Sequence, residues 1–349
     1  MKRRVWRPRA AMQQIWARFL QATGCLWWAK HQLHRRGAIV VLTFHRVLND
    51  AECQRTCSLA GIVIRRRTFE SLAGFVAGEC QAVDFAQAGA ASTGKMRIMF
   101  TFDDGWKDNY TNALPIMRAH GIPATVFVCP GLVGRTLPFW PELVTSLLTK
   151  ASPPAAAGEI ESLIENLKTY STERREQFIS RLCRLHAQDG GGNAYDGDQT
   201  VSWEDIRQMD TEGVRFGCHT HTHQILTAVP ARTARQEIRE SKKAIEAALH
   251  RPCDLFAYPN GNTSAATRRI LAEEGFTAAF TTQRGAWTNG CDRLAIPRVN
   301  VCEATVAGLS SRFSPAMFQY NVFWKAWRAR HAAESVPAKP RPEPVLSQA

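Results

Sequence analysis

Short runs of apolar, β-branched and aromatic residues recur along most of the chain, and helical patterns lie between them. Strands that alternate with helices favour a parallel sheet built from βαβ units. The predicted strands are residues 38–45, 97–102, 124–129, 214–219, 255–259 and 276–282. The clearest helical patterns are residues 112–120, 204–209, 233–250 and 265–274. Six or more such units in about 270 residues favour a (β/α) barrel over a short open sheet.

Several segments fall outside this alternation. Residues 140–200 contain "SPPAAAGE", a helical stretch and "DGGGNAYDGD", which together indicate a helical insertion with a glycine-rich exit. The predicted organisation is a basic, tryptophan-rich arm, a barrel that carries the insertion, a C-terminal helical segment and a disordered proline-rich tail, over residues 1–36, 37–310, 311–334 and 335–349.

The positive charge is concentrated at the N-terminus. The net charge is +13, and the first acidic residue is Asp50. Ten basic residues precede it: Lys2, Arg3, Arg4, Arg7, Arg9, Arg18, Lys30, Arg35, Arg36 and Arg46. No nucleic-acid-binding motif accompanies them, so nucleic acid is not an expected partner.

Tryptophans gather at the same ends of the chain. Six of the ten are Trp6, Trp16, Trp27, Trp28, Trp324 and Trp327. Tryptophan mixed with basic residues favours an anionic lipid interface, so we expect peripheral membrane binding. The alternative is that both ends form helices packed on the barrel.

Two features of the sequence, an apolar run near the N-terminus and the cysteines, bear on the cellular compartment. The apolar run "FLQATGCLWWA" is short and contains Gln21, so it predicts a retained segment rather than a cleaved signal peptide. The ten cysteines are scattered without a paired framework, which favours free thiols in a reducing compartment. The expected location is cytoplasmic, or peripheral on the cytoplasmic face of the inner membrane.

Two polar clusters follow predicted strands. Asp103 and Asp104 end "RIMFTF" and precede Gly105, which makes a turn inexpensive. Both carboxylates can reach one site only if the chain turns there; capping of the next helix would explain only one of them. In the second cluster, "FGCHTHTHQ", any of three histidines is a candidate metal ligand: His219, His221 and His223. Two histidines and one carboxylate would leave a coordination position for water or substrate.

These motifs resemble those of the polysaccharide deacetylases that share the nodulation-protein-B homology domain, carbohydrate esterase family 4. "TFDDG" at 101–105 is similar to the first motif, and His219-Thr220-x-x-His223 to the second. "FAYPNG" at 256–261 and "RLAIPRVNV" at 293–301 resemble later motifs of exopolysaccharide-type members. The resemblance spans roughly residues 38–305. It implies a distorted (β/α) barrel and metal-dependent removal of N-acetyl groups from an N-acetylated amino sugar.

The resemblance also implies roles for single residues. Asp104, His219 and His223 resemble the ligands of a divalent metal, for which Zn²⁺ is the first choice, and Asp103 resembles the general base. His221 falls on a non-ligand position.

The chain departs from the family pattern at three points. Ala257 stands where many members have an arginine that orients the base, and Arg298 is the candidate replacement. Asn260 stands at the oxyanion position, with Tyr258 beside it as a second candidate for oxyanion or substrate contact. The usual late histidine is missing, and His45, at the end of the first strand, is the candidate general acid.

Two other functions remain open on the sequence. One is a hydrolase of the same fold that cleaves another carbon–nitrogen bond, such as a formyl or cyclic amide. The other is a non-catalytic sugar-binding module, although binding alone does not need a base beside a metal site.

Overall fold

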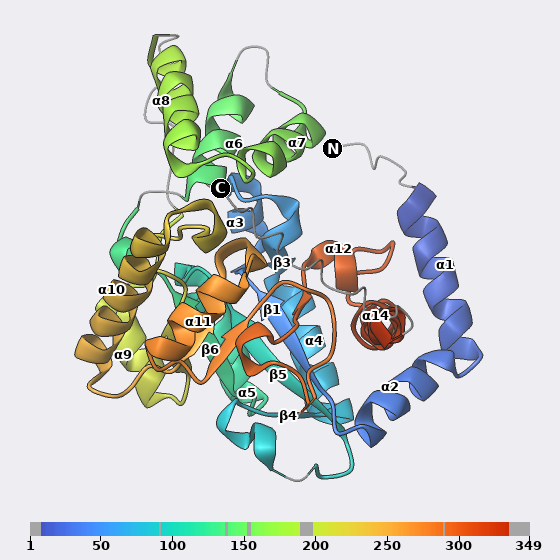
Figure 1. Ribbon diagram of the computed structural model, residues 1–349. Coiled ribbons are helices and arrows are strands. Elements are labelled where there is room, and N and C mark those ends of the chain that lie inside the picture. Colours follow the sequence, from blue (N-terminus) through green and yellow to red (C-terminus); the bar gives the residue numbers. More distant parts are fainter. Residues whose placement is uncertain are drawn as a thin grey trace, which may run out of the picture.

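The computed structural model describes residues 8–90, 92–136, 139–151, 155–188, 198–288 and 290–334. Its centre is a parallel sheet in the order β10-β1-β5-β6-β7-β8-β9, with β4 paired to β5 beside this path (Figure 1). The strands are β1 (Ile39–Phe44), β4 (Cys80–Ala82), β5 (Met96–Phe102), β6 (Ala124–Val128), β7 (Arg215–Cys218), β8 (Leu255–Ala257), β9 (Ala278–Phe280) and β10 (Val299–Asn300). All six strands predicted from the sequence therefore form.

The sheet curls into a distorted barrel, as the sequence predicted. One short segment touches both of its edges. Ile296 bridges Phe280 of β9, and three residues later Val299 pairs with Leu42 of β1. This segment therefore joins the first and last parts of the parallel sheet.

The strands are buried on both faces, which is why they appear in the sequence as continuous apolar runs. In β1, Val40 and Leu42 pack in the cluster beneath the helices, whereas Ile39 and Val41 pack in the barrel interior. The period-two alternation of a strand thus supplies two separate cores from one segment. Aromatic rings such as Phe127 and Phe280 fill the interior.

Helices surround the sheet on its outer side. They are α4 (Arg66–Glu79), α5 (Leu114–Ala119), α9 (Trp203–Thr211), α10 (Ala231–Leu249) and α11 (Ala265–Glu273). A π-helical turn, Asn109–Ala113, leads into α5. A two-stranded sheet of β2 (Arg46–Leu48) and β3 (Val63–Arg65), with α3 (Asp50–Arg55) between its strands, adds to one side.

The predicted insertion is helical. It contains α6 (Trp140–Lys150), α7 (Ala157–Leu167) and α8 (Thr172–Gln188), drawn in green above the barrel in Figure 1. These helices share a small core of Val144, Ile160, Ile164 and Leu167. The predicted glycine-rich exit falls largely on residues 189–197, which lie outside the described part of the chain.

Helices also form at both ends. At the N-terminus these are α1 (Pro8–Ala22) and α2 (Cys25–Arg35); at the C-terminus, α12 (Glu303–Val306), α13 (Pro315–Gln319), a π-helical turn Tyr320–Trp324 and α14 (Lys325–Glu334). Trp28 packs edge-on against Trp327, so the two ends contact each other. The predicted tail, 335–349, and Trp6 lie outside the described residues.

Within the described residues, no helix is long and apolar enough to cross a membrane. All ten cysteines lie in the described part, and none forms a disulfide.

Candidate active site

The two polar clusters of the sequence meet at the carboxyl edge of the sheet. Asp103 and Asp104 follow β5, and His219 follows β7, with β6 between those strands. All three line a pocket of about 370 Å³, together with His223. In a parallel α/β fold this edge is where ligand-binding side chains gather.

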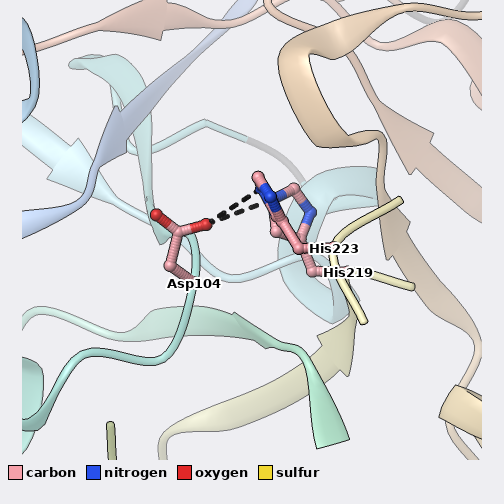
Figure 2. Close-up of side chains that lie close together, drawn as sticks. All are labelled: Asp104, His219 and His223. Carbon is pink, nitrogen blue, oxygen red and sulfur yellow. Dashed lines mark ion pairs between the residues drawn. The ribbon is translucent and has the colours of Figure 1, made fainter. Parts of the chain in front are cut away.

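Asp104, His219 and His223 place one ligand atom each around a common point. Oδ1 of Asp104 lies 3.5 Å from Nε2 of His219 and 3.4 Å from Nε2 of His223. Figure 2 shows the carboxylate facing both imidazole rings. This Oδ1 is buried and has no hydrogen-bond partner within the described part of the chain. A buried carboxylate oxygen without a donor is costly, and a cation shared with the two nitrogens would satisfy it.

The tautomer of His219 supports the same conclusion. Its Nδ1 lies 2.8 Å from the carbonyl oxygen of Ala257, and because a carbonyl only accepts, Nδ1 carries the proton. In a neutral ring the lone pair of Nε2 is then directed at Oδ1 of Asp104. Burial alone would lower the pKa of His219, but the negative charges of Asp103 and Asp104 raise it above its usual value. The surroundings therefore favour a positive charge at this point. The donor set therefore fits a divalent metal, and hydrogen bonding to a carbonyl is the usual support for a histidine ligand.

A carboxylate on α10 holds the histidine loop. Glu237 accepts hydrogen bonds from the backbone N–H groups of His221 and Thr222, at 2.9 and 2.8 Å, and from the Thr222 hydroxyl at 2.8 Å. His221 is not part of the three-residue cluster, as the resemblance implied.

Left-handed backbone conformations concentrate at this site. Positive φ values are found at Asp104 (74°), Thr220 (60°), His223 (64°) and Asn260 (57°). Such conformations are costly for residues other than glycine and persist where the surroundings impose them, commonly at functional sites. At Asp104 the turn directs its carboxylate to the histidines, while Asp103 still donates its N–H to Phe44 in the manner of a strand. The turn therefore lets adjacent aspartates serve one pocket.

Gly105 is required directly after this turn. Its φ is 70°, and a Cβ at this position would lie 2.8 Å from Cγ1 of Val128. The site thus depends on the glycine of "DDG" for both conformation and space.

Asp103 is paired with Arg298. The guanidinium donates two hydrogen bonds to the carboxylate, at 2.8 and 2.7 Å, and its Nε donates to the carbonyl oxygen of Thr281. Both side chains are almost fully buried, with 0% and 3% exposed for Arg298 and Asp103. Burial alone would raise the pKa of Asp103, but the guanidinium beside it lowers that pKa below the usual carboxyl range. Asp103 is therefore held ionised and in one orientation.

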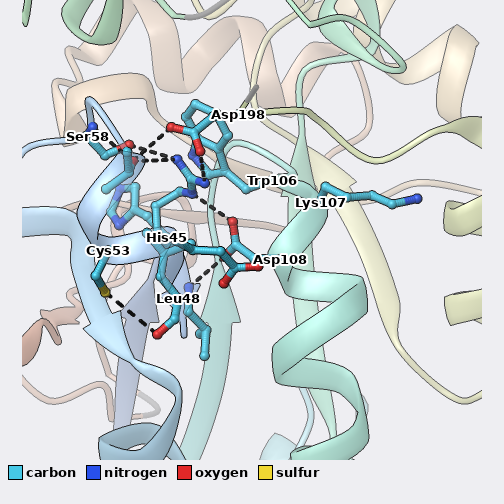
Figure 3. A network of polar contacts seen from close by, with 12 residues as sticks. His45, Leu48, Cys53, Ser58, Trp106, Lys107, Asp108 and Asp198 are labelled. Carbon is cyan, nitrogen blue, oxygen red and sulfur yellow. Dashed lines mark hydrogen bonds and ion pairs between the residues drawn. The ribbon is translucent and has the colours of Figure 1, made fainter. Parts of the chain in front are cut away.

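A second buried arginine supports the other side of the site. Arg46 donates to Asp108 at 2.7 Å and to Asp198 at 2.8 Å, and its guanidinium lies 4.1 Å from the ring centre of Trp106. The Trp106 indole N–H donates to Oδ2 of Asp104 at 3.1 Å. Figure 3 shows Asp108, Asp198 and Trp106 gathered in this network. The network thus links a metal-type ligand to residue 198, near the end of the insertion.

His45 lies in the pocket, as predicted. Its Nδ1 is buried and has no hydrogen-bond partner among the described residues, while its backbone carbonyl accepts from Asn109. Burial lowers the pKa of His45, so the ring is neutral near pH 7.

The two oxyanion candidates have different positions. Asn260 lines the pocket, but Tyr258 does not. The Tyr258 side chain is fully buried beneath the helices, its hydroxyl donates to the carbonyl oxygen of Leu294, and its backbone N–H donates to Phe280. Neither donor is available to a ligand, so the prediction that Tyr258 contacts substrate or oxyanion is wrong.

The insertion supplies one wall of the pocket, which sequence reasoning did not predict. Phe139, Trp140, Glu142, Ile164 and Lys168 line it. Glu142 is 4% exposed, and burial, followed by the nearby charge of Asp104, raises its pKa to about 8. The pocket therefore combines carboxylates with an apolar and aromatic wall.

Sequence reasoning also missed Arg46, Trp106 and Glu237. The only local signal was the position of Trp106, one residue after "DDG". The partners of Arg46 are distant in the chain, and Glu237 lies on an ordinary helical pattern.

Fold and site together define a class: an α/β barrel hydrolase with a cluster of two histidines and one carboxylate that could hold a metal ion, and a separate aspartate beside it. The family model described as polysaccharide deacetylase matches residues 90–279. The chain belongs to the polysaccharide deacetylase family, whose enzymes hydrolyse carbon–nitrogen bonds other than peptide bonds.

Individual relatives are distant. YxkH of Bacillus subtilis (strain 168), which bears the name of a polysaccharide deacetylase, is 21% identical over 204 residues, or 58% of this chain and 51% of the relative. The chain thus matches about half the length of this curated relative.

Solved structures agree in fold. The deacetylase PplD of Streptococcus pyogenes, solved in complex with acetate, has a TM-score of 0.55 at 17% identity, covering 82% of this chain and 98% of its own. IcaB from Ammonifex degensii has a TM-score of 0.53 at 20% identity, covering 84% of this chain and 96% of its own.

Proposed function

We propose that this protein is a metal-dependent hydrolase that removes N-acetyl groups from an N-acetylated amino sugar in a polysaccharide, oligosaccharide or lipid-linked glycan. The observation that carries the proposal is the pairing of two different carboxylates in one pocket. Asp104 faces two histidine nitrogens, whereas its neighbour Asp103 faces Arg298. A binding module needs neither arrangement, whereas metal-assisted hydrolysis of an amide uses both.

Asp104, His219 and His223 would hold the ion, for which Zn²⁺ suits the nitrogen-rich donor set. A divalent cation bound there would polarise the amide carbonyl and make water more acidic.

The remaining roles belong to the chain itself. Asp103, kept ionised by Arg298, accepts the proton of the attacking water. His45, whose side chain lines the pocket, supplies the proton that the departing amine needs once its ring has been protonated. The backbone N–H of Asn260 is the proposed donor to the developing oxyanion.

The walls of the pocket fit a sugar better than a compact cyclic amide. Leu59, Ile62, Trp140 and Ile225 offer apolar surface, and Asn300 and Lys168 offer polar groups. Sugar rings present an apolar face and a polar rim, so a wall of mixed character is expected.

Release of acetate from N-acetylglucosamine oligomers and lipid-linked N-acetylated sugars, with and without chelator, tests the proposal. Asp104→Ala and His219→Ala should lose bound metal and activity together, as measured by elemental analysis. Asp103→Asn should keep the metal and lose about 100-fold or more of turnover. Release of formate or ammonia instead of acetate would indicate a different amide substrate, and full metal content in the ligand variants would refute the site.

A further inference from the structure

Helix α1 carries an apolar stripe that no other described part of the protein covers. Met12, Ile15, Trp16 and Phe19 are spaced as i, i+3, i+4 and i+7, so they share one face of the helix. Their exposed fractions are 62%, 67%, 49% and 53%. We call these four residues the α1 stripe. Among the described residues, only four other large apolar side chains are exposed: Trp27, Trp28, Leu185 and Leu309.

The opposite face of α1 attaches the helix to the rest of the protein. Ala17 is buried against Ala316 and Met317 of α13, and Gln14 accepts a hydrogen bond from the backbone N–H of Leu309 at 2.7 Å. Figure 1 shows α1 and α2 along one edge of the molecule, with α14 on their inner side. The helix is therefore apolar on both sides, and packing on the barrel explains only the inner one. The expectation that the terminal helices pack on the rest of the protein therefore holds for the inner face, and the outer face stays open.

The charge around the stripe indicates what covers it. No acidic residue occurs before Asp50, whereas ten lysines and arginines do; of these, Arg46 is buried beside the pocket and Lys30 is paired with Glu79. Arg18 is exposed on α1 itself, and Arg35 at the end of α2. A second copy seated on the stripe would bring the same positive charges into contact, which opposes self-association. An anionic bilayer offers both an apolar interior and complementary charge.

We propose that the α1 stripe binds the surface of an anionic lipid bilayer. The helix has 15 residues, a length of about 22 Å, which is shorter than the hydrocarbon core. It would lie parallel to the surface, with Trp16 and Phe19 among the acyl chains and the arginines at the phosphates. The inference concerns a surface apart from the pocket and stands independently of the proposed activity. The cytoplasmic face of the inner membrane stays the predicted location.

Vesicle flotation of the full-length protein tests this. Vesicles of phosphatidylcholine with phosphatidylglycerol should carry the protein at about 50 mM salt and release most of it at about 500 mM, because salt screens the charges. Vesicles of phosphatidylcholine alone should carry little. The double variant Trp16→Glu/Phe19→Glu should reduce partitioning on the order of tenfold or more.

A matched control distinguishes the stripe from apolar surface in general. Leu185 of α8 is 50% exposed and belongs to the insertion, so Leu185→Glu should float as the wild type does. Circular dichroism and pocket metal content should be unchanged in all variants. Failure of the wild type to float, or flotation of the double variant at the wild-type level, would overturn the proposal. So would a dimer in sedimentation that dissociates in the double variant, because the stripe would then bind a second copy.

Discussion

Replacement of Arg298 by methionine should destabilise the protein in a way that depends on pH. The change removes the guanidinium bonded to Asp103 while keeping much of the side-chain volume. The side chains of Arg298 and Asp103 are 0% and 3% exposed and share two hydrogen bonds of 2.8 and 2.7 Å. Water is therefore excluded from this ion pair. An exposed ion pair contributes about 0–1 kcal/mol, but removing one partner of a buried pair costs about 3–5 kcal/mol, because the other charge is left unpaired.

The pH dependence follows from the direction of the pKa shift. In the wild type the pKa of Asp103 is lowered, since the guanidinium outweighs burial. Its stabilising contribution is therefore present above the unfolded value of about 3.9 and is lost as pH falls through the folded value. Without the guanidinium, burial raises the pKa above the unfolded value. The deficit of Arg298→Met should then be largest at neutral pH and shrink as pH falls toward about 5.

Urea unfolding at several pH values, in the presence of chelator so that only the charges of the chain act, measures this deficit. Arg97→Met is the matched control. Arg97 is also buried, at 7% exposure, but the partners to which it donates in the described ranges are uncharged: the carbonyl oxygens of Gly37, Ala88 and Ala90. Its loss should cost stability by an amount that does not change with pH.

The same variant should shift the activity profile. If Asp103 is the base, the acid limb of kcat/KM for acetate release should move up by about 1–3 pH units in Arg298→Met, the usual effect of losing an adjacent opposite charge. An unfolding free energy within about 1 kcal/mol of the wild type, together with an unmoved acid limb, would refute the argument that this pair is energetically coupled.

Three further changes test the surroundings of the site. Trp106→Phe keeps an aromatic ring but removes the N–H that donates to Asp104. The affinity for metal, measured by competition with a chelator, should therefore fall by about 10–100-fold. An unchanged affinity would mean that the indole N–H does not support metal binding. His45→Asn should keep metal and fold yet lose turnover by about 100-fold, and near-normal turnover across the pH profile would place the acid elsewhere. Burial and then Asp104 raise the pKa of Glu142 to about 8, so the wild type loses stability as pH rises from about 4.5 to 8. Glu142→Gln should therefore gain stability relative to the wild type over this range and level off above it; a flat margin in urea unfolding would contradict that cause.

The main strands could be predicted because burial on both faces makes each of them a continuous apolar run. The strands that were missed, β2, β3 and β4, have three residues each. Three residues show no periodicity, and their pairing depends on partners that the sequence does not reveal. Cys80–Ala82, for example, forms a strand only because Met96 and its neighbours lie alongside.

The residues of the candidate site also differ in whether they could be predicted from the sequence. The residues that could be found from sequence sit in compact motifs at strand ends, where type and spacing carry the information. Among those that were missed, Trp106 contacts a residue only two positions away, whereas Arg46 and Glu237 contact segments that only the fold brings near them. Glu237 appears as one more charged residue on an amphipathic helix, yet it accepts three hydrogen bonds from the histidine loop. Arg46 reaches Asp198 over 152 residues of sequence, and only the fold brings them together.

The position of Tyr258 could have been predicted from strand alternation. Along β8, Leu255 and Ala257 pack in the barrel interior, whereas Phe256 and Tyr258 pack beneath the helices. A residue two places after Phe256 faces the same side, so the tyrosine faces away from the pocket. The same alternation places Ala257 inside the barrel, at the position where the family resemblance expects an arginine.

The guanidinium that Ala257 cannot supply comes from a different segment of the chain. Arg298 lies just before β10, its guanidinium stands 5.7 Å from the ring centre of the interior residue Phe127, and it reaches Asp103 from there. The physical requirement is one cation in the barrel interior beside one carboxylate, because Asp103 buried alone would take up a proton and lose its value as a base. Any strand end that opens on the interior can meet that requirement. The arginine can therefore move between segments while the carboxylate stays fixed beside Asp104, the metal-type ligand that it adjoins.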